Sequence, residues 1–324
     1  MAELRWNPFI KDWVMIASHR QNRPHLPKDW CPFCPGSGKV PDKFDVFQYD
    51  NDFPALSINP PLPDDVGTSF FKTAPAYGKC EVVLYTSEHS KSLSQLSVPH
   101  VEKLVDLWIE RFTALSKDEK LKYIFIFENR GEVVGVTMPH PHGQIYGYSY
   151  LPKKIELECE AMKDYQDHSQ RCLQCDSLEE ELIVKDRIIY QNKSFVLYLP
   201  FYIEYPYGIQ IVSKRHFSNI TEMNHAEKAD LAEIILIATG SLDELFDKPF
   251  PYMMCFHNAP INLGKEIPWH FHIEFFPPMR SGDKQKFNAS SETGAWAHCN
   301  PTAPEEKAKE LQIACKKYLE KILR

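Results

Sequence analysis

The stretch His140-Pro141-His142-Gly143-Gln144 restricts the fold and the chemistry of this chain more than any other. Two histidines that are two residues apart point to the same side of an extended segment. The proline between them stiffens the backbone. The glycine and the glutamine offer close backbone approach and an uncharged amide donor. This combination predicts an imidazole nucleophile beside groups that hold a phosphate.

A similar pattern returns later in the chain as His270-Phe271-His272-Ile273-Glu274. Each copy is preceded by a Cys-x-x-Cys pair, a single histidine and an asparagine, in the same order. These residues are Cys31, Cys34, His89 and Asn129 before the first copy, and Cys172, Cys175, His216 and Asn258 before the second. Four elements in one order indicate an internal duplication. We therefore predict two halves, residues 1–160 and 161–324.

Each half supplies a complete set of tetrahedral Cys₂His₂ metal ligands. The two sets are Cys31, Cys34, His89 and His140, and Cys172, Cys175, His216 and His270. Thiolate and imidazole ligands favour zinc, and four protein ligands leave no open position, so we predict two structural zinc sites. As a ligand, His140 would also anchor the strand end that presents His142. The alternative is that the cysteines are ordinary buried or redox residues.

Composition excludes several classes of protein. With 324 residues, 43% of them hydrophobic and 25% charged, the chain is typical of a soluble globular protein. The net charge of −7 argues against a general binder of nucleic acid or anionic membranes. No apolar run approaches the roughly 20 residues of a membrane span, and no signal peptide is expected. The nine cysteines include two metal-type pairs, and we expect a cytoplasmic protein.

Strand-like and helix-like segments are mixed along the chain without strict alternation. Short β-branched and aromatic runs predict strands, and apolar residues at helical spacing predict helices. The expected strands cover 80–85, 123–127, 195–199 and 208–212, and the expected helices cover 98–116, 224–246 and 304–323. This order favours an α+β fold with a mostly antiparallel sheet flanked by helices.

The segment from Phe127-Glu128-Asn129 through Pro139-His140-Pro141-His142-Gly143-Gln144 strongly resembles the galactose-1-phosphate uridylyltransferases, a branch of the histidine-triad superfamily. Further matches extend over most of the chain. They are Arg5-Trp6-Asn7-Pro8, His19-Arg20-x-x-Arg23-Pro24, Asn51-Asp52-Phe53-Pro54-Ala55-Leu56, and Cys80-Glu81-Val82-Val83 through His89-Ser90-Lys91-Ser92-Leu93. The resemblance implies a duplicated histidine-triad-like fold.

The resemblance also implies a reaction, in which UDP-glucose and galactose 1-phosphate give glucose 1-phosphate and UDP-galactose. It runs by double displacement through a uridylylated histidine, which matches His142. A neutral imidazole is a good nucleophile near pH 7, and a covalent intermediate divides the transfer into two in-line displacements. The other implied contacts are Gln144 and Asn129 at the phosphate, Arg20 and Arg23 at the diphosphate, and Asn51, Asp52 and Phe53 around the uridine.

The second half departs from the best-known members of the family. Those members hold a second metal with a glutamate and three histidines, and the matching positions here are Glu158, His257, His272 and Glu274. Because one histidine has become Glu274, we favour the second Cys₂His₂ zinc site and keep an iron-type site as the alternative. Repulsion between Glu274 and a phosphate argues against a second catalytic centre.

The sugar-binding end is expected in the C-terminal segment, where Glu292 and His298 are candidates for contacts with the hexose. His298 stands where the best-known members have a glutamine, which leaves the acceptor sugar open. Lys286 is a weaker candidate for a phosphate contact. The family usually forms homodimers with sites shared between subunits, so a homodimer is expected.

Two other functions compete with the uridylyltransferase. One is a nucleotide-sugar phosphorylase that uses orthophosphate, and phosphorylase-like relatives often have serine where this chain has Gln144. The other is a non-enzymatic, zinc-stapled nucleotide-binding protein. The intact His142-Gly143-Gln144 set argues against that second alternative. The expected ligands are therefore UDP-glucose and a hexose 1-phosphate.

Overall fold

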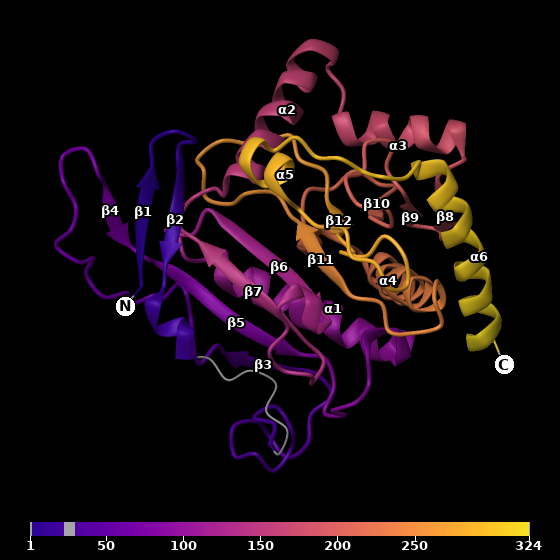
Figure 1. Ribbon diagram of the computed structural model, residues 1–324, viewed down its shortest axis with the longest axis horizontal. Coiled ribbons are helices and arrows are strands. Elements are labelled where there is room, and N and C mark those ends of the chain that lie inside the picture. Colours follow the sequence, from indigo (N-terminus) through magenta and orange to yellow (C-terminus); the bar gives the residue numbers. More distant parts are fainter. Residues whose placement is uncertain (1, 23–29, 324) are drawn as a thin grey trace.

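The computed structural model describes residues 2–22 and 30–323, which form two sheets and a set of helices (Figure 1). The small sheet has the order β2-β1-β4 and the large sheet the order β3-β5-β7-β6-β11-β12-β10-β9-β8. The small sheet contains β1 (Glu3–Asn7), β2 (Asp12–Ile16) and β4 (Thr73–Pro75). The large sheet contains β3 (Phe47–Asp50), β5 (Gly78–Leu84), β6 (Tyr123–Arg130), β7 (His142–Tyr148), β8 (Ile188–Gln191), β9 (Phe195–Tyr198), β10 (Gln210–Ser213), β11 (Tyr252–His257) and β12 (His272–Phe275).

Apart from the additional edge strand β8, the strand order of the large sheet is the same when it is read outward from its centre in either direction. β6 and β11 pair at the centre, and β7, β5 and β3 follow on one side as β12, β10 and β9 follow on the other. Neighbouring strands of the described chain are antiparallel throughout. The predicted α+β class, the antiparallel sheet and the duplicated architecture are confirmed.

Helices α1 (Val98–Leu115), α4 (His225–Glu244) and α6 (Pro304–Ile322) cover one face of the large sheet (Figure 1). In α4 the Asn224 side chain accepts a hydrogen bond from the Glu227 amide, which caps the first turn. The longest helices pack on one another, and their apolar side chains form the main core with alternate residues of the central strands. Ile124 and Ile126 of β6 point into this core. Since side chains alternate along a strand, Phe125, Phe127 and Asn129 leave the opposite face.

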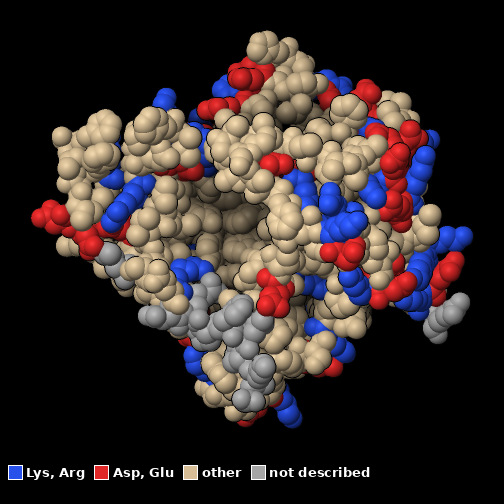
Figure 2. All heavy atoms as spheres, in the orientation of Figure 1, with Lys and Arg blue, Asp and Glu red and all other residues tan. Residues whose placement is uncertain are grey.

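That opposite face carries the hollow of the molecule. In Figure 2 it opens over the region where β6 and β7 lie in Figure 1. Helices α2 (Lys153–Ser169), α3 (Leu173–Val184) and α5 (Ser290–Ala295) lie towards one side of this hollow, and the small sheet lies to another. Residue 160, where we divide the halves, lies inside α2. Among the described helices, none has the length and apolar character needed to span a bilayer.

Short 3₁₀ turns stand at matching places before α1 and α4. They are η2 (Leu93–Gln95) and η4 (Ile220–Glu222), while η1 (Ser18–Asn22) and η3 (Glu132–Val134) lie in the first half only. Leu93 and Ile220 are both buried beneath these turns. The turns follow His89 and His216, so the two halves lead from the single histidine to the core helix in the same way.

Candidate active site

The first predicted metal set comes together in the structure. Its four ligand atoms, from Cys31, Cys34, His89 and His140, lie within 4.8 Å of one another. The Cys34 Sγ atom is 3.2 Å from Nδ1 of His89 and 3.6 Å from Nδ1 of His140. In a tetrahedral zinc site, with bonds of about 2.3 Å to sulfur and about 2.1 Å to nitrogen, a sulfur and a nitrogen lie about 3.6 Å apart. These residues could therefore hold a metal ion of the size of zinc.

His140 is prepared as a ligand by its surroundings. Its Nε2 lies 2.8 Å from the carbonyl oxygen of Thr86, and because a carbonyl only accepts, Nε2 carries the hydrogen and Nδ1 faces the metal position. Burial lowers the pKa of His140 to about 4, which keeps the ring neutral. A neutral, oriented imidazole is the form that binds a metal.

The second predicted set has the same geometry. The ligand atoms of Cys172, Cys175, His216 and His270 also lie within 4.8 Å of one another. The Cys175 Sγ atom is 3.6 Å from Nδ1 of His216 and 3.3 Å from Nδ1 of His270. On its other side, Nε2 of His270 lies 2.9 Å from the carbonyl oxygen of Ser213. Two Cys/His clusters that could each bind a metal are thus present.

Glu158, His257 and His272 form a third cluster, separate from the second Cys/His set. We expected these two groups to be alternatives, but different residues build them and the structure assembles both. Nδ1 of His257 is 3.0 Å from Glu158, and its Nε2 is 3.0 Å from Glu274. Lys154 also forms an ion pair with Glu274. The two carboxylates therefore have cationic partners of their own.

These ion pairs set the charge on His257. Burial alone would lower its pKa, but the carboxylates of Glu158 and Glu274 raise the pKa of His257 to about 9. A protonated His257 and Lys154 together balance the two carboxylates. The cluster is consequently neutral with protein groups alone, and its histidine already gives both ring nitrogens to carboxylates.

His142 is the first residue of β7, and its ring is oriented by the chain that precedes it. Its Nδ1 lies 2.7 Å from the carbonyl oxygen of His140, so Nδ1 carries the hydrogen and the lone pair of the neutral ring is on Nε2. The Phe33 ring packs against His142 with 5.4 Å between centroids. The carbonyl group of His140, a candidate metal ligand, therefore fixes the tautomer and the orientation of the His142 ring.

A cavity of about 180 Å³ opens beside His142 and Gln144. Its wall contains the predicted Asn51, Asp52 and Phe53. Other described residues of the wall are Trp30, Pro32, Phe33, Lys39, Tyr49, Val82, Thr137 and Met138. The structure thus places three predicted nucleoside contacts next to the predicted nucleophile.

Asp52 is held by two residues that the sequence did not point to. Its carboxylate accepts a hydrogen bond from the Tyr49 hydroxyl at 2.6 Å and pairs with the Lys39 ammonium at 2.7 Å. The hydrogen bond with Asp52 raises the pKa of Lys39, so the Lys39 ammonium group is charged at neutral pH. No spacing rule links Lys39 to Asp52, because the intervening chain forms an irregular loop before β3.

Gln144 is oriented by a neighbouring tyrosine that was not among the predicted site residues. The Tyr146 hydroxyl donates to Oε1 of Gln144 at 3.3 Å and accepts from Arg20 Nη1 at 3.1 Å. With its oxygen engaged, the amide of Gln144 presents its N–H groups as donors. Tyr146 is two residues after Gln144 on β7, a spacing that puts both side chains on one face.

Asn129 is carried towards His142 by the strand register. β6 and β7 pair Phe127 with Gln144, and continuing that register brings Asn129 opposite His142. Opposite residues of an antiparallel pair share a face, so Asn129, His142 and Gln144 leave the sheet on the same side.

The remaining predicted contacts lie apart from this cavity or outside the described residues. Glu292 is on α5, where it caps the Ala289 amide at 3.1 Å, and His298 lies 3.2 Å from Glu204. Neither is among the described residues of the cavity wall. Arg23 lies outside the described residues.

Known proteins resemble this chain over most of its length. The galactose-1-phosphate uridyl transferase N-terminal domain family matches residues 1–152, and the corresponding C-terminal domain family matches residues 158–309. A galactose-1-phosphate uridylyltransferase of Thermotoga maritima is 42% identical over 96% of this chain and 98% of its own. Another, of Haemophilus influenzae, is 31% identical over 87% of this chain and 86% of its own.

Solved structures agree with this similarity. A structure described as uridylyltransferase superposes with a TM-score of 0.89 and 32% identity, covering 98% of this chain and 99% of its own. An ADP-glucose phosphorylase from Arabidopsis thaliana, with bound ADP-glucose, has a TM-score of 0.75 and 25% identity, covering 96% of this chain and 98% of its own. With both domain families matched and this identity over nearly the whole chain, the protein belongs to the galactose-1-phosphate uridylyltransferase family.

Proposed function

We propose that this chain transfers a uridylyl group from UDP-glucose to galactose 1-phosphate, through a covalent intermediate on His142. The observation that carries this proposal is the fixed ring of His142, with its lone pair on Nε2, beside Gln144 in a cavity lined by Asn51, Asp52 and Phe53. Membership of the family supports the same reaction. The enzyme would then act in galactose metabolism.

In the first displacement, Nε2 of His142 attacks the α-phosphorus of UDP-glucose. A nitrogen–phosphorus bond forms, the bond from the α-phosphorus to the bridging oxygen breaks, and glucose 1-phosphate leaves with the electron pair. In the second, a phosphate oxygen of galactose 1-phosphate attacks the same phosphorus. The nitrogen–phosphorus bond breaks and UDP-galactose leaves, so His142 returns to its neutral form.

Charge grows on the α-phosphate oxygens during both displacements, and the surrounding donors would stabilise it. Gln144 would donate its amide N–H, with Tyr146 holding the amide oxygen. Asn129 would donate from the neighbouring strand, and Arg20 and Arg23 would hold the diphosphate. Asn51, Asp52 and Phe53 would surround the uridine.

We further propose zinc at the two Cys/His clusters, where it would serve as a structural cross-link. The ligand distances support this assignment, since they match a tetrahedral site with no open position. For Glu158, His257 and His272 we assign no metal, because both ring nitrogens of His257 already contact carboxylates and Lys154 pairs with Glu274. Iron there is the alternative that a metal analysis would reveal. Each half, 1–160 and 161–324, would then carry one zinc.

We also propose a homodimer in the cytoplasm, with each site completed by the partner subunit. The support is that Glu292 and His298 do not line the described cavity wall around His142. Mixing the inactive variants His142→Gly and Glu292→Ala tests this arrangement. A shared site predicts that activity returns after subunit exchange, because one of the two sites then has both intact residues. A site complete in one chain predicts no return of activity.

The covalent intermediate is tested by denaturing mass spectrometry after mixing the protein with UDP-glucose alone. We expect a mass gain of one uridylyl group, discharged by galactose 1-phosphate and absent from a folded His142→Gly variant. Discharge by orthophosphate but not by the sugar phosphate would instead identify a phosphorylase. Absence of any adduct with UDP-glucose or ADP-glucose, at full zinc content, would identify a binding protein.

A further inference from the structure

Gly143 lies between His142 and Gln144 and faces away from the substrate side of the sheet. A Cβ atom at Gly143 would lie 2.3 Å from the hydroxyl oxygen of Tyr85. The Tyr85 hydroxyl therefore occupies the space that a side chain at position 143 would need. The Tyr85 amide also donates to the carbonyl oxygen of Pro141 at 3.2 Å. Tyr85 thus contacts the backbone of this segment both before and after His142.

The Tyr85 hydroxyl lies near a buried carboxyl group, that of Glu128. Both side chains lie inside the core, with exposed fractions of 1% for Tyr85 and 4% for Glu128. Burial raises the pKa of the Tyr85 hydroxyl well above its ordinary value, so the hydroxyl keeps its hydrogen. Glu128 precedes Asn129 on β6, and the two side chains leave opposite faces of the sheet.

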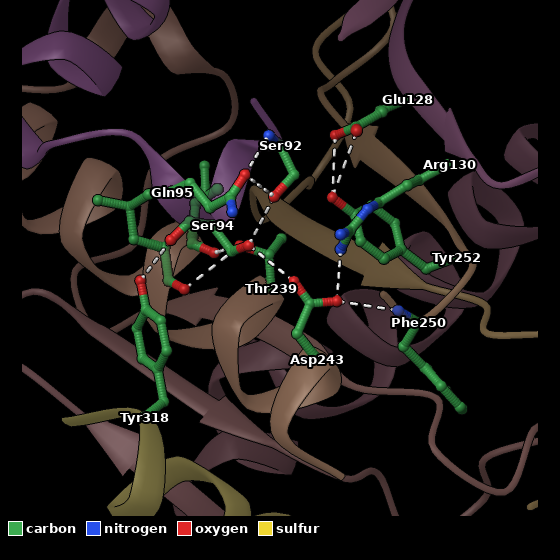
Figure 3. Close-up of polar contacts among 12 residues, drawn as sticks. Ser92, Ser94, Gln95, Glu128, Arg130, Thr239, Asp243, Phe250, Tyr252 and Tyr318 are labelled. Atoms are coloured by element: carbon green, nitrogen blue, oxygen red, sulfur yellow. Dashed lines mark hydrogen bonds and ion pairs between the residues drawn. The ribbon is translucent and has the colours of Figure 1, made fainter. Parts of the chain in front are cut away.

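Glu128 also receives a hydrogen bond from the second half of the chain. The Tyr252 hydroxyl lies 3.2 Å and 3.3 Å from its two carboxyl oxygens (Figure 3). Beside this contact, Arg130 pairs with Asp243 at 2.7 Å, and the Arg130 guanidinium lies over the Tyr252 ring. The centre of the large sheet is therefore joined by polar contacts on its helix side.

Asp243 extends these contacts into the helix layer. It accepts from the Ser94 hydroxyl at 2.7 Å and from the Phe250 amide at 2.9 Å (Figure 3). Ser94 lies in η2 of the first half, whereas Asp243 and Phe250 belong to the second. Glu128 is consequently connected through Tyr252 and Arg130 to this polar cluster, which limits the movement of Glu128 beside Tyr85.

We propose that Tyr85 and Glu128 are positioning residues for the transfer reaction. From the helix side of the sheet, they fix the positions of His142 and Gln144 on the opposite side. Gly143 is required at its position because the Tyr85 hydroxyl occupies the space of a side chain. This inference rests on the proposed function of His142 as the nucleophile. Its physical basis is that a nucleophile displaced by 1 Å loses on the order of 100-fold in rate.

Tyrosine-to-phenylalanine changes give a matched test, since Tyr85 and Tyr252 both lie beside Glu128 and both are buried. Of these two tyrosines, Tyr85 alone is among the nearest neighbours of a Cβ atom at Gly143. In single-turnover reactions with UDP-glucose, we expect Tyr85→Phe to slow formation of the uridylyl adduct about 10-fold. Tyr252→Phe should stay within about 2-fold of the wild type, although both variants lose one buried hydroxyl group and similar stability.

A double variant separates a shared contact from two independent effects. Because Tyr85 and Glu128 would act through one contact, Tyr85→Phe/Glu128→Gln should be no slower than the slower single variant. Amide hydrogen exchange of the Gly143–Gln144 segment gives a readout that does not depend on the reaction. Exchange should be faster in Tyr85→Phe than in Tyr252→Phe.

Equal rates and equal exchange in the two tyrosine variants would overturn the inference. If the wild type formed no uridylyl adduct, the proposed function would fail, and the exchange comparison would still decide whether Tyr85 holds this segment. If the wild type reacted and Tyr85→Phe matched it in both measurements, only the positioning role would be wrong. Should Glu128→Gln not fold, the two isosteric tyrosine variants still decide the outcome.

Discussion

Nδ1 of His142 lies 2.7 Å from the carbonyl oxygen of His140, and the second half repeats this contact at 2.9 Å between His272 and His270. In each half, a metal-ligand candidate orients the histidine that follows it by two residues. Only the first half has Gln144 after its oriented histidine, whereas the second has Glu274. Both halves therefore keep the contact that orients the histidine ring. The residue expected to face a phosphate differs, because it is Gln144 in the first half and Glu274 in the second.

The second half has a carboxylate, Glu274, where the first half has the amide of Gln144. This difference predicts the effect of replacing the Gln144 amide by a carboxylate. Gln144→Ala removes one donor to the α-phosphate and should slow uridylylation by about 100-fold. Gln144→Glu should slow it further, because a carboxylate repels the phosphate. Single-turnover rates with UDP-glucose measure both. A Gln144→Glu variant as fast as Gln144→Ala would show that the side chain does not face the phosphate.

The two Cys/His clusters predict two zinc ions per chain with different effects on the reaction. Cys31→Ser should remove one zinc and slow uridylylation, because the carbonyl of His140 orients His142. Cys172→Ser should also remove one zinc, lower the melting temperature, and leave the rate of adduct formation closer to the wild type. Metal analysis and single-turnover rates, measured on the same samples, check this.

More than two metal ions per chain would contradict the proposal that Glu158, His257 and His272 hold no metal. Iron or zinc that persists in Cys172→Ser/Cys175→Ser beyond one ion per chain would locate it at Glu158, His257 and His272. The corresponding control is His257→Gln, which removes a member of that cluster and should leave the zinc content at two.

The Lys39–Asp52–Tyr49 contacts predict a role in binding rather than in chemistry. Lys39→Met leaves the Asp52 carboxylate without its cation at the edge of the nucleoside cavity. We expect KM for UDP-glucose to rise about 10-fold with kcat little changed, since a contact present in both ground and transition states alters binding alone. Steady-state kinetics measure this. Lys43→Met, which removes an exposed cation nearby in the sequence, serves as the control.

Glu128 predicts a dependence of stability on pH. Burial raises its pKa from the ordinary value near 4.5 to about 7, against the opposing effect of Arg130, while Asp243, Tyr85 and Tyr252 also surround it. The folded chain therefore holds this proton more tightly than the unfolded chain. As pH rises from 4.5 through 7, ionisation of Glu128 lowers the free energy of unfolding.

Comparison with Glu128→Gln isolates this effect, because the amide does not ionise. From pH 5 to pH 8 the variant should gain about 2 kcal/mol in unfolding free energy relative to the wild type. Urea denaturation at the two pH values measures the difference. A difference between the two proteins that is constant with pH would show that Glu128 does not titrate in this range.

Much of the regular structure was predictable from local patterns. The expected helices over 98–116, 224–246 and 304–323 match α1, α4 and α6 within two residues at each end. Helices α2, α3 and α5 were missed, as were strands β3, β8, β11 and β12 of the large sheet. α2 buries only Ile155, Cys159 and Met162 against the rest of the chain, so its apolar stripe is too narrow to stand out from a polar sequence. The small sheet was missed because its strands are short and only partly buried.

The sequence by itself determined the two Cys₂His₂ sets, the nucleophile candidate and the duplication, because metal ligation and strand geometry require particular residues at particular spacings. Only the tertiary structure decided that a third cluster stands beside the second set, that Lys39 and Tyr49 hold Asp52, and that Tyr85 supports Gly143 with Glu128. The physical reason is that most of these contacts join residues distant in the sequence. Strand register and core packing bring them together, and neither leaves a local pattern.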